Sequence, residues 1–287
     1  MFNKDDYVIG TLLESARLAL APISESPLLD AQLLLARSMG CSRTALLAND
    51  PHGLVSDAIY AQFQEFLEKR LAGYPVAYLL GYKEFYGRNF YVDERVLIPR
   101  PDTEILVEAV IQYAQTHAVQ RIREVGFGSG AIALTLACEL EHKMIIASDV
   151  SADAYAVFAK NHTNLKASLR SEVHFFVGNL WDDGGDADIL VSNLPYLTRA
   201  ETQERMELLW REPALALDGE VEVGDGGLGL IYQLIEQAKG RVQALFLEAS
   251  SEQMPHLAQA LRQANFPNIF IEKDLAGSAR VIWAFLR

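Results

Sequence analysis

The tetrapeptide 193–196, Asn-Leu-Pro-Tyr, stands where an apolar run ends and carries groups that could hold an amide or an aromatic amine. The preceding residues 188–192 predict a buried parallel strand that stops before Pro195, because proline has no N–H for a ladder. Pro195 also restricts Leu194 to extended angles, so the Asn193 side-chain carbonyl and the Leu194 main-chain carbonyl can point the same way. Two such acceptors suit a planar NH2 group, and Tyr196 would supply a flat wall. The alternative interpretation is an ordinary turn that ends a strand.

A second segment with chemical potential joins a strand pattern to an apolar helix at residues 121–130. Alternate glycines in this segment allow a tight turn and close approach of the backbone to a ligand, although many α/β proteins need such a turn only for packing. A dinucleotide site would favour the spacing G-x-G-x-x-G, whereas the spacing here is G-x-G-x-G. The turn that could face a ligand consists of Gly126, Phe127, Gly128, Ser129 and Gly130, and Glu124 stands near the end of the strand before it.

Two further strands should bring polar groups to the same edge of a sheet, where ligands of open α/β proteins bind. Residues 144–149 predict a strand that ends in the carboxylate of Asp149. An acid at the end of the second strand, about twenty residues after the glycines, can accept hydrogen bonds from both hydroxyls of a ribose. Asp149 could instead cap the helix that follows. Residues 173–178 predict a third strand, which delivers Asn179 and Leu180.

The rest of the chain predicts the scaffold for these segments. Residues 1–73 have the spacing of amphipathic helices and indicate a small helical domain for packing or for docking a partner. Residues 74–100 are rich in aromatic residues, β-branched residues and turn glycines, which favours a β-hairpin connector. In residues 101–287 strands alternate with helices and close with a hairpin, which predicts an α/β fold with a mostly parallel sheet and an antiparallel edge.

Composition limits the classes of function. With 287 residues and 50% hydrophobic residues, the chain can build one large α/β domain and a small one. It lacks a run of about 20 apolar residues and a signal-peptide pattern, so we expect a cytoplasmic protein without membrane contact. The net charge of −13 opposes binding to many phosphates, and no nucleic-acid substrate is expected. Cys41 and Cys138 should be reduced thiols, and no Cys/His spacing suits a metal.

Several segments together resemble one family. Residues 100–104, Arg-Pro-Asp-Thr-Glu, resemble the Arg-Pro-Asp/Glu-Thr-Glu segment of the HemK/PrmC family, the glutamine methyltransferases that modify peptide chain release factors. Asn-Leu-Pro-Tyr matches three of the four positions of the Asn/Asp-Pro-Pro-Tyr motif of amino-methyltransferases that use S-adenosylmethionine. Glu124 before the glycines is similar to the acidic-x-Gly-x-Gly-x-Gly form of methyltransferases. The resemblance runs from about residue 74 to the end, and more loosely over the helical N-terminus.

This resemblance implies a Rossmann-like S-adenosylmethionine-dependent methyltransferase fold, with a seven-stranded mostly parallel sheet and a small N-terminal helical domain that docks the substrate protein. It implies a monomeric enzyme that methylates the glutamine amide nitrogen in the Gly-Gly-Gln motif of release factors. The glycine loop, Asp149 and Leu180 would bind the cofactor, and Asn179 would accept a hydrogen bond from the adenine amine. Asn193 would lie beside both the cofactor and the substrate amide, and the rest of the tetrapeptide would complete the catalytic socket.

Four positions depart from the family pattern, and three other functions stay open. The departures are Phe127 for a small residue, Asn179 for Asp, Leu194 for the first proline, and Ala249 for a glycine. A glutamine methyltransferase for a ribosomal protein would use the same chemistry. An amino-methyltransferase for adenine in nucleic acid would need a basic, base-flipping surface. A relative that binds release factors without turnover would follow if the departures had removed activity.

Overall fold

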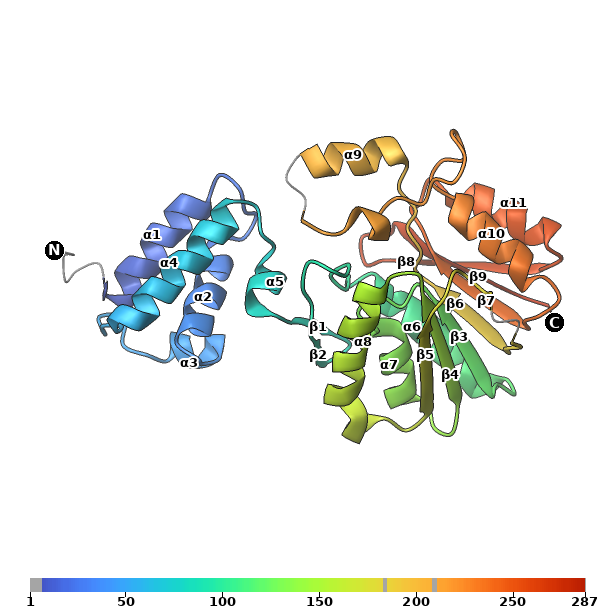
Figure 1. Cartoon of the computed structure of the whole chain (residues 1–287), viewed down its shortest axis with the longest axis horizontal. Coiled ribbons are helices and arrows are strands. Elements are labelled where there is room, and N and C mark those ends of the chain that lie inside the picture. Colours follow the sequence, from blue (N-terminus) through green and yellow to red (C-terminus); the bar gives the residue numbers. More distant parts are fainter. Residues whose placement is uncertain (1–6, 183–184, 208–210, 287) are drawn as a thin grey trace. The chain divides into compact units, whose positions relative to one another are not determined.

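The structure, a computed structural model, describes residues 7–182, 185–207 and 211–286, and the chain divides into two compact units. One unit consists of Met1–Tyr82 with Glu207–Arg211, and the other of Lys83–Met206 with Glu212–Arg287. Figure 1 shows helices in the first unit and a sheet covered by helices in the second.

The first unit is a set of helices around its own apolar core. The helices are α1 (Ile9–Leu20), α2 (Pro27–Ser38), α3 (Arg43–Leu47), α4 (Asp57–Leu71) and α5 (Val76–Leu80). Leu20 of α1, Leu34 of α2 and Phe63 of α4 are buried together in this core. The Arg211 guanidinium belongs to the same unit, where it donates to the Ala72 carbonyl at 3.1 Å. The helical character predicted for residues 1–73 is thus present in the described part of that range.

The second unit is built on a seven-stranded sheet in the order β5-β4-β3-β6-β7-β9-β8. The strands are β3 (Arg121–Val125), β4 (Met144–Asp149), β5 (Glu172–Val177), β6 (Ile189–Ser192), β7 (Ala244–Glu248), β8 (Asn268–Lys273) and β9 (Ala279–Phe285). The strands from β5 to β7 pair in parallel, and β9 runs antiparallel to β7 and β8. The strand order reverses at β3, where α/β sheets open a ligand crevice. The predicted fold class is confirmed.

Helices cover both faces of the sheet. Successive side chains of a strand point to opposite faces, so their contacts show which helices lie on which face. The Phe246 and Trp283 rings contact Tyr113 of α6: their centroids lie 5.6 and 6.1 Å from the centroid of the Tyr113 ring. Leu245 and Ile282 instead share an apolar core with α10 and α11, which lie across the sheet from α7 and α8 in Figure 1. The bounds are α6 (Thr103–Thr116), α7 (Ala131–Glu139), α8 (Ala152–Leu165), α9 (Arg199–Glu207), α10 (Gly229–Ala238) and α11 (Met254–Gln263). A hairpin of β1 (Lys83–Phe85) and β2 (Arg88–Phe90) precedes them.

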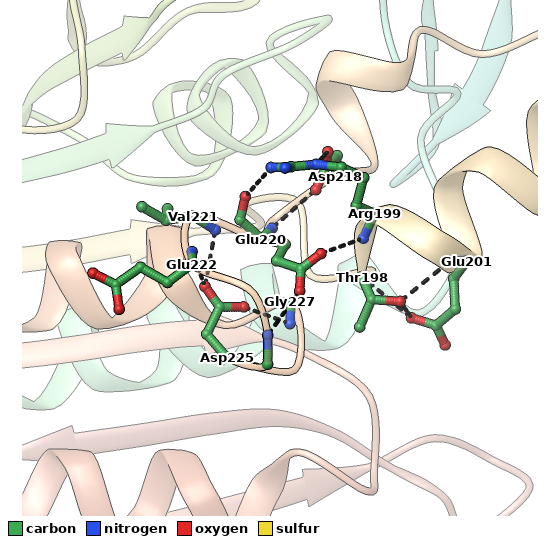
Figure 2. A network of polar contacts seen from close by, with 10 residues as sticks. Thr198, Arg199, Glu201, Asp218, Glu220, Val221, Glu222, Asp225 and Gly227 are labelled. Carbon is green, nitrogen blue, oxygen red and sulfur yellow. Dashed lines mark hydrogen bonds and ion pairs between the residues drawn. The ribbon is translucent and has the colours of Figure 1, made fainter.

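A loop before α10 folds back on itself around one carboxylate. Asp225 accepts hydrogen bonds from the N–H groups of Val221, Glu222 and Gly227, at 2.8, 3.0 and 2.9 Å, as Figure 2 shows. Burial raises the pKa of Asp225, but the backbone N–H bonds outweigh burial and hold this pKa below its ordinary value. The loop is therefore closed by a charge that is ionised at neutral pH.

This loop lies directly on the backbone of the tetrapeptide 193–196. Gly219 and Gly227 have no room for a side chain: a Cβ would come within 2.2 Å of the Pro195 carbonyl oxygen at Gly219, and within 2.4 Å of the Tyr196 carbonyl oxygen at Gly227. The Gln253 side chain donates both to the Tyr196 carbonyl and to a carbonyl of the loop, each at 2.8 Å. The loop thus fixes where the tetrapeptide lies.

Replacing Gly227 by alanine should destabilise the protein more than the same change at Gly240. Both residues have left-handed backbone, with φ of 78° and 73°, which costs a non-glycine residue about 1 to 2 kcal/mol. Only Gly227 also meets a clash, since a Cβ at Gly240 has nothing within 4 Å. The clash should add about 1 to 3 kcal/mol. Urea unfolding of both variants measures the difference, and equal losses would contradict the close packing.

Candidate active site

Most of the predicted site residues meet around a cavity of about 630 Å³ at the carboxyl ends of β3, β4 and β6. Those in its lining are Glu124, Gly126, Phe127, Gly128, Ser129, Asp149, Asn179, Leu180, Asn193, Leu194 and Pro195. Gly130 and Tyr196 are not among the lining residues. A larger groove, of about 930 Å³ along α6 and β9, contains none of these residues. The smaller cavity has the size and the few polar groups typical of a cofactor site.

The glycine loop approaches the tetrapeptide closely. Gly126 has φ of 78°, and a Cβ there would lie 3.0 Å from Leu194 Cδ2. Gly128 has open space beside it and lines the cavity, so a ligand can reach the backbone at this point. Gly130 instead faces the ring of Phe158, which a Cβ would meet at 2.7 Å. The lack of a side chain at Gly126 therefore lets Leu194 pack against the loop, and the lack of one at Gly128 leaves space in the cavity.

Helix α8 holds the same loop from behind. The Phe127 ring is buried and packs on Phe158, with centroids 4.6 Å apart. Asn161, fully buried on this helix, donates to the carbonyls of Ser129 and Tyr91 at 2.8 and 2.9 Å. Sequence reasoning missed Asn161, because a single polar residue on a helix gives no signal until its neighbours in space are known.

Two carboxylates stand at the ends of neighbouring strands. Asp149 of β4 accepts hydrogen bonds from the N–H groups of Gly128 and Ser151, each at 2.9 Å, so it joins the glycine loop to the start of α8. Burial raises the pKa of Asp149, and these two bonds oppose the rise. Glu124 of β3 is 1% exposed and accepts from the Ala133 N–H at 2.9 Å. Burial raises the pKa of Glu124 to about 8, so a cation in the cavity would favour its ionised form.

Asn179 and Leu180 follow β5 at the rim of the cavity. Leu180 has φ of 46°, an uncommon conformation for a residue with a Cβ. Its carbonyl accepts a hydrogen bond from Ser148 Oγ at 3.0 Å, and its side chain is buried in the core. Asn179 is exposed, so its amide is accessible to a ligand in the cavity.

The tetrapeptide is fixed on both sides after β6. Ser192 Oγ donates to the last carbonyl of β3 at 2.6 Å. Asn193 Nδ2 donates to Thr103 Oγ1, at the N-terminus of α6, at 3.1 Å. Leu194 is 6% exposed and covers Gly126. The residue that stands in place of the family's first proline therefore packs the tetrapeptide against the glycine loop.

Tyr196 lies near a buried carboxyl instead of in the cavity lining. Glu248, the last residue of β7, is 3% exposed, and burial raises its pKa to about 7. Burial, followed by the Glu248 charge, raises the pKa of Tyr196 to about 12. Sequence reasoning noted this part of the chain only for Ala249 in place of glycine and missed the carboxyl beside it.

An ion pair between the buried Glu212 and the partly exposed Arg100 lies at the edge of the site. Glu212 is 3% exposed, accepts from the Ile98 N–H at 2.8 Å and pairs with the Arg100 guanidinium. Arg100 also lines the cavity. The pair anchors the Arg-Pro-Asp-Thr-Glu segment to the chain that follows the tetrapeptide, a link that the sequence did not reveal.

Comparison with known proteins identifies the family. The chain is 35% identical over 267 residues to the release factor glutamine methyltransferase of Bordetella pertussis, which covers 91% of this chain and 95% of that protein. It is 36% identical over 266 residues to the enzyme of the same name from Neisseria gonorrhoeae, covering 90% and 93%. The chain belongs to the release factor glutamine methyltransferase family. Residues 11–81 of this family member also match the model of the PrmC N-terminal domain.

The family membership confirms the resemblance drawn from the motifs. The solved catalytic domain of human METTL16 in complex with the MAT2A 3′UTR hairpin 6 is similar to this methyltransferase with a TM-score of 0.53 and 17% identity, over 70% of this chain and 77% of that chain. This similarity shows the shared fold alone. Across residues 7–182, 185–207 and 211–286, no helix is long and apolar enough to cross a membrane, and no cluster of His, Cys, Asp and Glu is suited to a metal.

Replacing Glu124 by glutamine should stabilise this methyltransferase above pH 5. The folded pKa of about 8 lies above the ordinary value of 4.5, so unfolding releases a proton and stability falls as pH rises from about 4.5 to about 8. Glutamine keeps the acceptor for Ala133 without this loss, which at about 1.4 kcal/mol per pKa unit amounts to about 2 to 5 kcal/mol by pH 8. Urea unfolding at pH 5 and pH 8 tests this, with the exposed Glu68→Gln as control. A constant difference between the two pH values would contradict the expectation.

Proposed function

We propose that this protein transfers a methyl group from S-adenosylmethionine to the side-chain amide nitrogen of the glutamine in the Gly-Gly-Gln motif of peptide chain release factors. The observation that carries the proposal is the near full-length similarity, at 35 and 36% identity, to two proteins named release factor glutamine methyltransferase. The site supports it, because Asn193 and the Leu194 carbonyl follow one strand at the edge of the cavity. We also propose that the enzyme works in the cytoplasm as a monomer.

The cavity fits S-adenosylmethionine in the chemistry of its lining. The open side of Gly128 admits a ligand to the backbone, and the buried Glu124 carboxyl favours a positive group such as the methionine amino group. Glu124 and the loop 126–130 would hold the methionine part, with Leu180 packing nearby. Asp149 would accept from the ribose hydroxyls, and Asn179 from the adenine amine. When bound, the cofactor supplies an electrophilic methyl group on its sulfonium.

The residues of the tetrapeptide would make the amide nitrogen reactive by alignment. An amide nitrogen is a weak nucleophile because its lone pair is delocalised into the carbonyl, so catalysis gains from fixing its direction. Asn193 Oδ1 and the Leu194 carbonyl would accept the two N–H groups, and Pro195 would keep the Leu194 carbonyl in place. Tyr196 would support the backbone of this turn. The nitrogen proton leaves to water after the N–C bond forms, so no general base is needed beforehand.

The domain roles are part of the proposal. Residues 1–73 would dock the release factor, residues 74–100 would connect, and residues 101–287 would carry the methyl transfer. The match of residues 11–81 to the PrmC N-terminal domain supports a distinct module at this end.

Mass spectrometry tests the proposed activity directly. A release factor and a free Gly-Gly-Gln peptide would each be incubated with the full chain and S-adenosylmethionine. We expect one methyl group on the glutamine, and more turnover on the whole factor than on the peptide. Methyl transfer to a ribosomal protein or to adenine in nucleic acid, without transfer to the factor, would overturn the proposal in favour of those substrates.

Replacing Asp149 by alanine should weaken S-adenosylmethionine binding. The change would remove two charge-assisted hydrogen bonds to the ribose, which corresponds to about 2 to 4 kcal/mol after compensation by water. Calorimetry measures the affinity, with the exposed Asp57→Ala at the start of α4 as control. An unchanged affinity in folded Asp149→Ala would remove this residue from the site.

Replacing Asn193 by alanine should lower turnover with little effect on cofactor affinity. Loss of one preorganised acceptor costs about 2.7 to 4 kcal/mol in the transition state. Leu194→Pro is the matched variant, because Pro195 already restrains the backbone. It should change turnover by less than about tenfold, or 1.4 kcal/mol. Equal small effects on release-factor methylation would mean that the tetrapeptide is only a turn, and an inactive parent rescued by Leu194→Pro would mean that the missing proline had silenced it.

A further inference from the structure

One buried carboxyl group has no part in the function proposed above. Glu248 is 3% exposed, and its Oε2 atom makes no hydrogen bond within the described part of the chain. Burial raises the pKa of this carboxyl to about 7, and the neighbouring side chains of Thr103 and Asn193, both of which can donate to it, act in the opposite direction. A buried acceptor this close to Asn193 bears on which end of the Asn193 amide faces the cavity.

We propose that Glu248 and Thr103 set the orientation of the Asn193 amide, so that Nδ2 faces them and Oδ1 faces the cavity. The inference rests on the proposed function, in which Oδ1 accepts from the substrate amide. An ionised carboxylate can only accept hydrogen bonds, and Thr103 Oγ1 already accepts from Asn193 Nδ2 at 3.1 Å. With the rotatable Thr103 proton directed at Glu248, both groups offer only lone pairs to Asn193. Glu248 is thus a positioning residue that acts through Asn193.

The charged groups around Glu248 keep this arrangement sensitive to pH. Asp102, next to Thr103, raises the pKa of Glu248, and Arg280 of β9 lowers it. The Arg280 charge is shared, since its Nε lies 3.0 Å from Asp102 and 2.9 Å from Asp274. Tyr196, with a pKa of about 12, stays neutral. Glu248 therefore gains or loses its proton near neutral pH.

Protonation of Glu248 reverses the direction of the hydrogen bonds that link Glu248, Thr103 and Asn193. The carboxyl O–H can then donate to Thr103 Oγ1, which frees the Thr103 proton to donate to Asn193 Oδ1. The amide turns and presents Nδ2 to the cavity. A donor at that place cannot accept from a substrate N–H, so the acceptor pair is lost as pH falls below about 7.

Nuclear magnetic resonance of asparagine side-chain amides tests the orientation without any substrate. In full-length protein labelled with ¹⁵N at asparagine, the Asn193 signal is assigned by its loss in Asn193→Ala. We expect this signal to titrate with a midpoint near pH 7, and to stop doing so in Glu248→Gln. Glu272→Gln is the control, since that carboxylate accepts from Trp283 Nε1 on the sheet edge, and it should keep the titration. A signal that does not titrate in the parent, or that titrates equally in Glu248→Gln, overturns the inference.

Turnover with a release factor gives the second readout. Glu248→Gln and Thr103→Val should each lower kcat by about tenfold or more, the range expected for a misaligned acceptor. KM and S-adenosylmethionine affinity should stay within about threefold. Thr103→Ser keeps the hydroxyl and should restore kcat, and full activity of Thr103→Val would overturn the inference.

Stability separates misalignment from unfolding. Glu248→Gln removes a charge that is costly to bury, so its melting temperature at pH 8 should equal or exceed that of the parent while its kcat falls. If Glu248→Gln fails to fold, the inference is still tested by the titration of the parent protein and by the comparison of Thr103→Val with Thr103→Ser. If the parent methylates no release factor, the proposed function fails, and the amide titration still decides the orientation.

Discussion

Burial of carboxyl groups at the ends of parallel strands is the constraint on which this site depends. Glu124 is the second-last residue of β3, Asp149 and Glu248 are the last residues of β4 and β7, and burial raises the pKa of all three. A buried carboxylate is costly unless donors or cations surround it. The backbone supplies donors from Gly128 to Asp149 and from Ala133 to Glu124. For Glu124 and Asp149, which line the cavity, a bound cation and hydroxyl groups would further stabilise the ionised forms.

The glycine loop, the tetrapeptide and the loop before α10 are far apart in the sequence but pack closely against one another. Leu194 lies over Gly126, and the loop that carries Gly219 and Gly227 presses on the carbonyls of Pro195 and Tyr196. Neither side of the tetrapeptide can move without disturbing the other, because glycine contacts of this kind leave no space for adjustment. A departure at Leu194 therefore acts through packing as well as through backbone angles.

The sequence predicted the sheet, and most of the predicted site residues lie in the cavity lining, because local patterns determine strands and parallel strands gather their carboxyl ends. The range 144–149 was predicted and is β4. The missed residues act across the fold: Asn161 bonds to Tyr91, 70 positions away, and Glu212 to Arg100, 112 positions away. No local period encodes such pairs. Nor does spacing tell which face a turn residue takes, which is why Gly130 and Tyr196 were expected in a cavity whose lining does not include them.

The two acceptors that follow β6, Asn193 Oδ1 and the Leu194 carbonyl, are held in different ways. They therefore differ in their sensitivity to pH and to neighbouring side chains. The direction of the Leu194 carbonyl follows from the covalent restraint of Pro195, which neither pH nor a neighbouring side chain alters. The Asn193 amide has two chemically different ends of similar shape, so only the groups behind it distinguish them. Those groups include the titratable carboxyl of Glu248. In the proposed socket for the substrate amide, the Leu194 carbonyl would be a permanent acceptor, and the Asn193 acceptor would depend on a proton buried outside the cavity.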